Sequence, residues 1–398
     1  MTGINYGLYL FFAIISLLAI LNRNSIIVLP KRYCRLLMLL FIIILINSII
    51  SPYTPSFQYI ILGTCITCLP FFHYILSGNF KFKKNETSRL IDFLILSTII
   101  ICLFCMIESF INVAEKKEGL WYSKIFGLGF VSSFCNQSIA LSLYRYKQSN
   151  NRKYIKIVIF LALFIVLTMQ LKAIIGCLLL LSGYYLFTHK RRGAYLKLGL
   201  IMCFLIAILF SLPLFRDKVD KYVNIYITEG ASDGVARNAL YFVSGKIALD
   251  FFPLGTGQGT FASVASRLTH DRVLEDYGIS DVYGLNVDDG AHGSFLLDTH
   301  WANILGENGL LGLILYMTLF IYPIIDVWRI NKKHRVPVEY RFLVTTSIVV
   351  LIIESMVLPL PNRISFIFLY AGLMPIIFKN EIKPLNIQMV AYESSINK

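Results

Sequence analysis

Long apolar runs, separated by short polar stretches, are the dominant pattern of this sequence. Most runs have about 17 to 25 residues with almost no charge, which is the length that a helix needs to cross a bilayer. The runs lie at 6–28, 35–52, 56–78, 88–113, 123–144, 155–171, 173–188, 195–214, 301–328, 341–358 and 363–378. The pattern predicts an all-α polytopic membrane protein with about eleven transmembrane helices, within a range of about 10 to 12.

The composition agrees with the pattern. Hydrophobic side chains make up 57% of the 398 residues and charged ones 15%, and the mean hydropathy is +0.68. A soluble domain carries about 25% charged residues. The composition therefore excludes an ordinary soluble domain.

The net charge of +14 is arranged as in a membrane protein. Basic residues gather in alternate short loops, at 23–35, 81–89, 145–156, 190–197 and 329–341, and the intervening loops are poor in charge or balanced. This is the positive-inside pattern, not a nucleic-acid-binding patch. It predicts an extracytoplasmic N-terminus and a cytoplasmic C-terminus.

One long polar loop, 215–300, falls on the extracytoplasmic side. It holds 12 acidic and seven basic residues. A structureless stretch of this length is uncommon in a compact protein, so a functional loop that contains short helices is expected. The predicted organisation is an N-terminal transmembrane part (1–214), this loop (215–300), and a C-terminal transmembrane part with a cytoplasmic tail (301–398).

An amphipathic helix is predicted within the loop. Leu240, Val243, Ile247 and Phe251 have helical spacing, which favours a helix that lies on the membrane surface. Arg237 would lie in its first turn, where a guanidinium and free N–H groups suit a phosphate. A solvated arginine is the alternative. The glycine-rich run 255–259 follows Phe-Phe-Pro rather than a strand, so a tight turn is expected there and not a nucleotide site.

Polar side chains gather where the loop ends and the next apolar run begins. His300, Asn303 and Glu307 are spaced i, i+3 and i+7, so they share one helix face. An imidazole at a helix N-terminus tends to stay neutral, which suits a general base; a capping histidine is the alternative. Gly306 and Gly309 are expected to allow close packing.

Ionisable residues inside apolar runs are costly and should face a bundle interior. Three of them lie near the outer face of the membrane, Glu108, Lys172 and Glu354, with Arg363 at the start of the last run. A structural ion pair between Lys172 and Glu354 and a catalytic role for either are equally open. The two Cys-x-x-Cys spacings, at Cys65/Cys68 and Cys102/Cys105, lie inside apolar runs with no His or acid at ligand spacing, so no metal site and no cofactor are expected.

Three segments together resemble the O-antigen polymerase and O-antigen ligase superfamily. They are Thr168-Met-Gln-Leu-Lys172, the arginine-led helix that ends in Pro253-Leu-Gly-Thr-Gly-Gln-Gly-Thr-Phe261, and Thr299-His300 through Glu307-Asn-Gly-Leu-Leu-Gly312. The resemblance is concentrated in residues 165–315. It implies a multi-pass protein of the bacterial inner (plasma) membrane, with its active site facing the periplasm.

The resemblance also implies a reaction. A glycan linked to undecaprenyl diphosphate would be transferred to a sugar hydroxyl, with inversion and without a metal. His300 would activate the hydroxyl, and Arg237 and Lys172 would hold the diphosphate. Lys172 stands where the family usually has arginine. Arg216 is a weaker third cation, and Asn303 and Glu307 are candidate substrate-binding residues.

The two possible activities, polymerase and ligase, differ in the acceptor. A polymerase, which we favour, uses a second lipid-linked repeat, and a ligase uses the lipopolysaccharide core. The expected partners are the lipid-linked oligosaccharide, membrane lipid and, as a candidate, a chain-length regulator protein; nucleic acid is not expected. A polysaccharide transporter or lipid flippase is a weaker alternative, because the internal repeat typical of such proteins is not visible.

Overall fold

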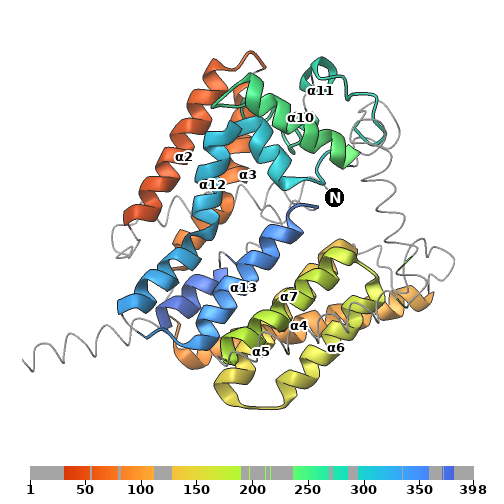
Figure 1. Ribbon diagram of the computed structural model, residues 1–398, viewed down its shortest axis with the longest axis vertical. Helices are drawn as coiled ribbons and strands as arrows, with labels where there is room; N and C mark the ends of the chain where they lie inside the picture. Colours follow the sequence, from red (N-terminus) through yellow and green to blue (C-terminus); the bar gives the residue numbers. More distant parts are fainter. Residues whose placement is uncertain are drawn as a thin grey trace, which may run out of the picture. The chain divides into compact units, whose positions relative to one another are not determined.

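The computed structural model describes residues 31–53, 56–78, 82–111, 128–189, 236–268, 272–285, 295–333, 335–357, 370 and 372–380, together with the single positions 197, 211 and 216. Helices account for all the regular secondary structure in these residues (Figure 1). The chain forms two compact units, each built from separate stretches of sequence. The units therefore cut across the three predicted segments, and each is described by itself.

The first unit comprises Met1–Phe80, Asp217–Tyr322 and Ser355–Pro375. Its helices are α2 (Lys31–Ile50), α3 (Phe57–Ser77), α10 (Ala236–Asp250), the 3-10 turn η3 (Ser266–Leu268), α11 (Arg272–Asp276) and most of α12 (His300–Lys333). The loop helix α10 thus belongs to the same compact unit as the apolar helices α2 and α3.

The second unit comprises Lys81–Arg216, Pro323–Glu354 and Ile376–Lys398. Its helices are α4 (Lys84–Ile111), α5 (Leu128–Ser149), α6 (Lys153–Thr168), α7 (Leu171–Thr188), the end of α12 and α13 (Val338–Glu354). Helix α5 packs against α4, α6, α7 and α13, so it is the central helix of the described bundle.

Five of the described helices are long and apolar enough to cross a membrane: α2, α3, α4, α7 and α12. Helices α5, α6 and α13 occupy three further predicted runs. The runs at 6–28 and 195–214 lie outside the described residues, apart from positions 197 and 211, and 363–378 is described only in part. The chain is thus a helical membrane protein, and the figure of about eleven helices stays a prediction.

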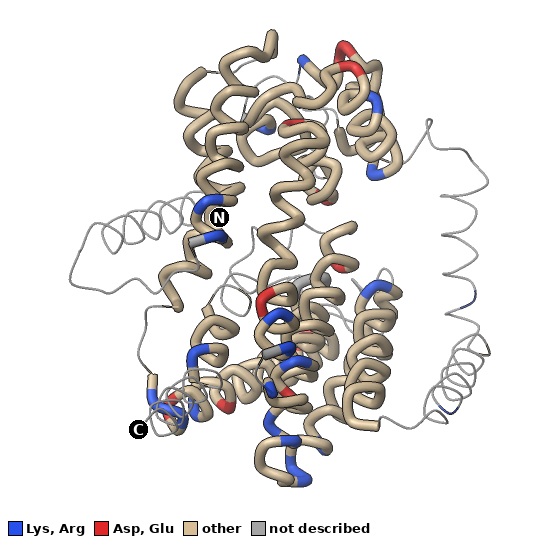
Figure 2. The backbone as a smooth tube through the Cα atoms, turned by 60° about the vertical axis from the view of Figure 1, so that its left-hand side comes forward, with Lys and Arg blue, Asp and Glu red and all other residues tan. Residues whose placement is uncertain are grey.

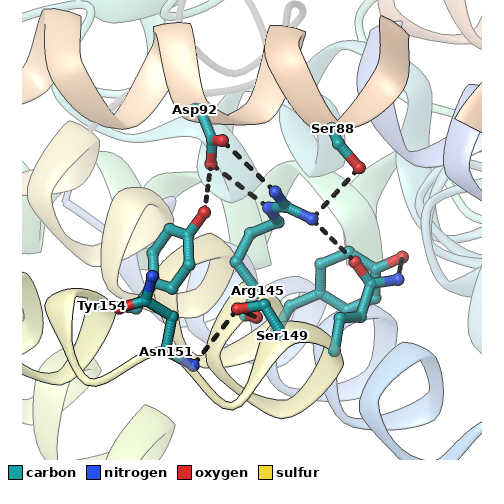
Figure 3. Close-up of polar contacts among 8 residues, drawn as sticks. Ser88, Asp92, Arg145, Ser149, Asn151 and Tyr154 are labelled. Carbon is teal, nitrogen blue, oxygen red and sulfur yellow. Dashed lines mark hydrogen bonds and ion pairs between the residues drawn. The ribbon is translucent and has the colours of Figure 1, made fainter. Parts of the chain in front are cut away.

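A polar network joins three helices of the second unit at the turn between α5 and α6. The guanidinium of Arg145 donates to both carboxylate oxygens of Asp92, at 3.2 and 3.3 Å, and to Ser88 at 3.1 Å (Figure 3). Tyr154 donates to Asp92 at 2.7 Å. The network joins α4, α5 and α6 at a turn where basic residues gather (Figure 2).

The apolar stripe of α10 packs against protein. Leu240, Val243 and Ile247 are buried in a cluster that also contains Phe261 and Ala302. The prediction of a helix with this stripe is confirmed, but the expectation that the stripe lies on the membrane is wrong. Hydrophobic spacing marks which face of a helix is buried, and it does not distinguish lipid from protein as the partner.

Candidate functional site

Helix α12 is broken at Gly309, where the backbone has φ 66° and ψ −170°. The chain turns back at this point, because the ring of His300 lies 5.3 Å from that of Tyr316 and the ring of Trp301 lies 5.7 Å from that of Phe320. The short helix 300–308 therefore runs alongside the long helix 310–333. The predicted continuous helix through 301–328 is wrong at this glycine.

The turn places His300 beside the long helix rather than at its end. Tyr316 is six residues past Leu310, which corresponds to about 9 Å along the helix. The backbone N–H of His300 donates to the carbonyl of Ser355 at 3.4 Å. The imidazole is 1% exposed, and neither ring nitrogen has a hydrogen-bond partner among the residues that the structure describes.

The glycine-rich loop after α10 satisfies the carbonyl groups that the break leaves unpaired. The N–H of Thr256 donates to the carbonyl of Gly306 at 2.9 Å, and the N–H of Gly257 donates to that of Glu307 at 3.0 Å. The side-chain amide of Asn47 also donates to the carbonyl of Glu307, at 2.5 Å. Helix ends need such partners, so the expected tight turn is confirmed and its structural function is to cap helix 300–308.

The glycines permit this close contact. A Cβ at Gly309 would overlap the backbone of Leu254, and one at Gly306 would overlap the ring of Phe261. The expectation that Gly306 and Gly309 allow close packing is confirmed.

Glu307 and Asn303 bind the same loop. The fully buried carboxylate of Glu307 accepts hydrogen bonds from the side chain of Gln258 at 2.5 Å, from the N–H of Gly259 at 2.9 Å and from that of Phe261 at 3.2 Å. The amide of Asn303 donates to the carbonyl of Phe261 at 2.7 Å. Both side chains are engaged with protein, so the structure gives them a scaffolding role, and their predicted contact with substrate stays a prediction.

Arg237 lies in the first turn of α10, as predicted, and forms an ion pair. Its guanidinium lies 2.6 Å from the carboxylate of Asp298, with the two side chains 27% and 20% exposed. Asp298 precedes His300 by two residues. The ion pair thus connects the start of α10 to the start of α12 and brings the predicted arginine and histidine into one region of the first unit.

Comparison with known proteins gives no assignment. No protein-family model matches the chain, and no curated protein matches it. The function must therefore be argued from the residues of the site.

The other two predicted cations lie in the second unit. Lys172, in the first turn of α7, interacts electrostatically with the buried carboxylate of Glu354, as one of the two sequence alternatives expected. Glu354 also accepts a hydrogen bond from the amide of Asn136 at 2.6 Å. Arg216 is an exposed position between stretches outside the described residues. The structure groups Arg237 with His300, and Lys172 with Glu354.

Tyr241, one turn after Arg237, is a site neighbour that sequence reasoning missed. Its hydroxyl donates to the carbonyl of Met356 at 2.7 Å. Burial raises its pKa to about 12, against a smaller opposing effect of Arg237. Tyr241 therefore stays protonated at neutral pH and cannot serve as a base.

Proposed function

We propose that the chain is a polysaccharide repeat-unit polymerase, which transfers a glycan from undecaprenyl diphosphate to a sugar hydroxyl of an acceptor repeat. One observation carries this proposal: the buried imidazole of His300, whose ring nitrogens have no hydrogen-bond partner among the described residues, lies two residues along the chain from Asp298, which pairs with Arg237. Buried polar groups normally have partners, since leaving one unpaired costs about 1–3 kcal/mol. Such a cost is typical of a functional site.

The two groups have complementary roles in this reaction. The acceptor hydroxyl attacks C1 of the donor sugar while the bond from C1 to the diphosphate oxygen breaks, with inversion at C1. His300 takes the proton from the attacking hydroxyl. Arg237 stabilises the negative charge that develops on the leaving diphosphate, which a guanidinium can bind through two parallel hydrogen bonds. Lys172, which the resemblance assigns to diphosphate binding, lies in the second unit, and its role stays a prediction.

The orientation is part of the proposal. We infer about eleven transmembrane helices and a periplasmic loop 215–300, in the bacterial inner membrane. The support is the charge pattern: α2 begins with the basic Lys31 and Arg32, whereas α11 in the loop carries the two acids Glu275 and Asp276 against one base, Arg272. Basic residues favour the cytoplasmic side.

Replacing His300 tests the catalytic part. His300→Gln keeps a hydrogen-bonding side chain of similar size but cannot take up the proton. Loss of general-base assistance costs about 10²–10⁴ in rate, so cells with this variant should make single-repeat product and no ladder of long chains. The measurement is a gel of the glycan, with immunoblotting to show equal membrane levels. A normal ladder would show that His300 is a capping residue and would remove its catalytic assignment.

A further inference from the structure

A cluster of aromatic rings surrounds His300 in the first unit. The ring of Tyr316 lies 5.3 Å from His300 and 4.8 Å from Phe71, and the ring of Trp301 lies 5.0 Å from His300 and 6.1 Å from Tyr316. Phe320 completes this group beside Trp301. The imidazole therefore lies beside rings contributed by both halves of α12, and Phe71 of α3 packs against one of them, Tyr316.

Two polar groups of this cluster, the imidazole of His300 and the hydroxyl of Tyr316, lack a hydrogen-bond partner in the part of the chain that the structure describes. Tyr316 is fully buried, and its hydroxyl has no hydrogen-bond partner among the described residues. The neighbouring Tyr370 is equally buried, but its hydroxyl donates to the carbonyl of Phe320 at 2.7 Å. Tyrosine normally finds a partner when it is buried, so Tyr316 differs from Tyr370 in the way expected of a ligand-binding group.

Unpaired groups and aromatic surfaces together define a type of ligand. The imidazole and the phenol can each donate or accept a hydrogen bond, and the rings beside them offer apolar contact. Small-molecule sites commonly combine aromatic walls with a few polar groups that fix orientation. A sugar ring meets both requirements, because it carries hydroxyl groups at its rim and apolar C–H groups on its faces.

We propose that Tyr316 binds a hydroxyl of the acceptor sugar beside His300, against the rings of Trp301 and Phe71. Tyr316 is then a substrate-positioning residue, supplied by the half of α12 that follows the break at Gly309. This inference rests on the proposed function and adds to it the residue that orients the acceptor.

The test compares two isosteric variants of the full-length protein, Tyr316→Phe and Tyr370→Phe, purified in nanodiscs. Without glycan, Tyr316→Phe removes an unpaired buried hydroxyl, so the Tm should rise, by about 2 °C if roughly 1 kcal/mol is gained. Tyr370→Phe removes a paired hydroxyl, so its Tm should fall. Changes in Tm of opposite sign for these two neighbouring tyrosines are expected if the unpaired hydroxyl of Tyr316 lowers stability and serves ligand binding.

Binding supplies the second readout. The probe is the lipid-linked repeat extracted from cells that lack this chain, titrated against an inactive His300→Gln background. Tyr316→Phe should weaken binding about tenfold, as expected for one lost hydrogen bond of about 1.4 kcal/mol, whereas Tyr370→Phe should not. Unchanged binding, or a Tm that falls as in Tyr370→Phe, would overturn the inference.

The two proposals fail separately. If His300→Gln abolishes the ladder and Tyr316→Phe leaves both ladder and binding unchanged, the polymerase proposal stands and the role of Tyr316 is refuted. If His300→Gln leaves the ladder intact, the catalytic assignment fails and this background no longer prevents turnover. The titration is then run on ice, with the probe recovered and its unchanged length confirmed on a gel, and weakened binding by Tyr316→Phe would still establish the glycan-binding residue.

Discussion

At the scale of single residues, the ion pair with Asp298 fixes the position of the Arg237 guanidinium. The ion pair is partly exposed, so its contribution to stability is small, typically below about 1 kcal/mol. Its value is geometric, because one oxygen of Asp298 fixes the guanidinium at 2.6 Å. Because Asp298 accepts from Nη2 of the guanidinium, it can hold Arg237 in position while a diphosphate binds to the same cation. The ion pair therefore fits a role of Arg237 in ligand binding better than a role in stabilising the fold.

The Arg237→Lys variant tests whether the guanidinium holds a diphosphate. A lysine keeps the charge but loses the paired hydrogen bonds, and a hydrogen bond to a charged group is worth about 1.5–3 kcal/mol. Activity should fall about tenfold to a hundredfold at normal membrane levels.

The matched control is Arg267→Lys, at an exposed arginine of the same loop region, which should keep full activity. Asp298→Asn should raise the apparent KM for the lipid-linked donor more than it lowers kcat, because it leaves the cation in place but less well oriented. Full activity of Arg237→Lys would make Arg237 an ordinary surface residue.

Several residue-scale features could be predicted from the sequence. The position of Arg237 in a first helical turn followed from the apolar spacing of Leu240, Val243 and Ile247. The partners could not be predicted in this way. Asp298 is one acidic residue among 12 in the loop, and Gln258 and Tyr316 carry no local signal, because their relation to Glu307 and His300 arises from chain reversal at Gly309.

The break in α12 is the main feature at the scale of elements. Apolar runs predicted the membrane helices well, since α2, α3, α4 and α7 fall within a few residues of their predicted ranges. Hydropathy does not reveal the reversal, because both halves of α12 are apolar and one glycine hardly changes the mean hydropathy of the run. The partner loop 253–257 lies about 50 residues earlier in the chain, beyond the reach of any periodicity.

Gly309→Ala tests the importance of this reversal. Alanine at positive φ is strained by about 1–2 kcal/mol, and its Cβ would overlap the backbone of Leu254, which adds about 1–3 kcal/mol of overpacking. The variant should unfold at lower temperature and lose activity, as measured by thermal melting and by the glycan ladder.

Two other glycines separate the effect of backbone strain from the effect of overlap with Leu254. Gly278 has φ +68° with nothing near its Cβ position, so Gly278→Ala should show only the strain. Gly245 lies inside α10 with open space around it, and Gly245→Ala should stabilise by about 0.5–1 kcal/mol. Equal stability of the Gly309 and Gly245 variants would contradict the described packing at the reversal.

The two compact units are the main feature at the scale of the whole molecule. Sequence order suggested a loop between two transmembrane parts, but in the first unit the loop 251–268 is hydrogen-bonded to α2, α3 and α12, and α10 packs in one apolar cluster with Phe261 and Ala302. Composition predicted a helical membrane protein because burial in lipid demands apolar runs. It could not predict how distant segments combine, since that depends on buried partners such as Asn47 with Glu307.

Reconstitution of the purified full-length chain in liposomes, with the lipid-linked repeat as sole substrate, tests the proposed polymerisation most directly. If the chain is the polymerase, it should convert the repeat to a ladder of longer lipid-linked glycans and release undecaprenyl diphosphate, and His300→Gln should do neither. Absence of a ladder with intact substrate, in preparations whose folding is confirmed by thermal melting, would contradict polymerisation. Transfer only to added lipopolysaccharide core would instead establish a ligase.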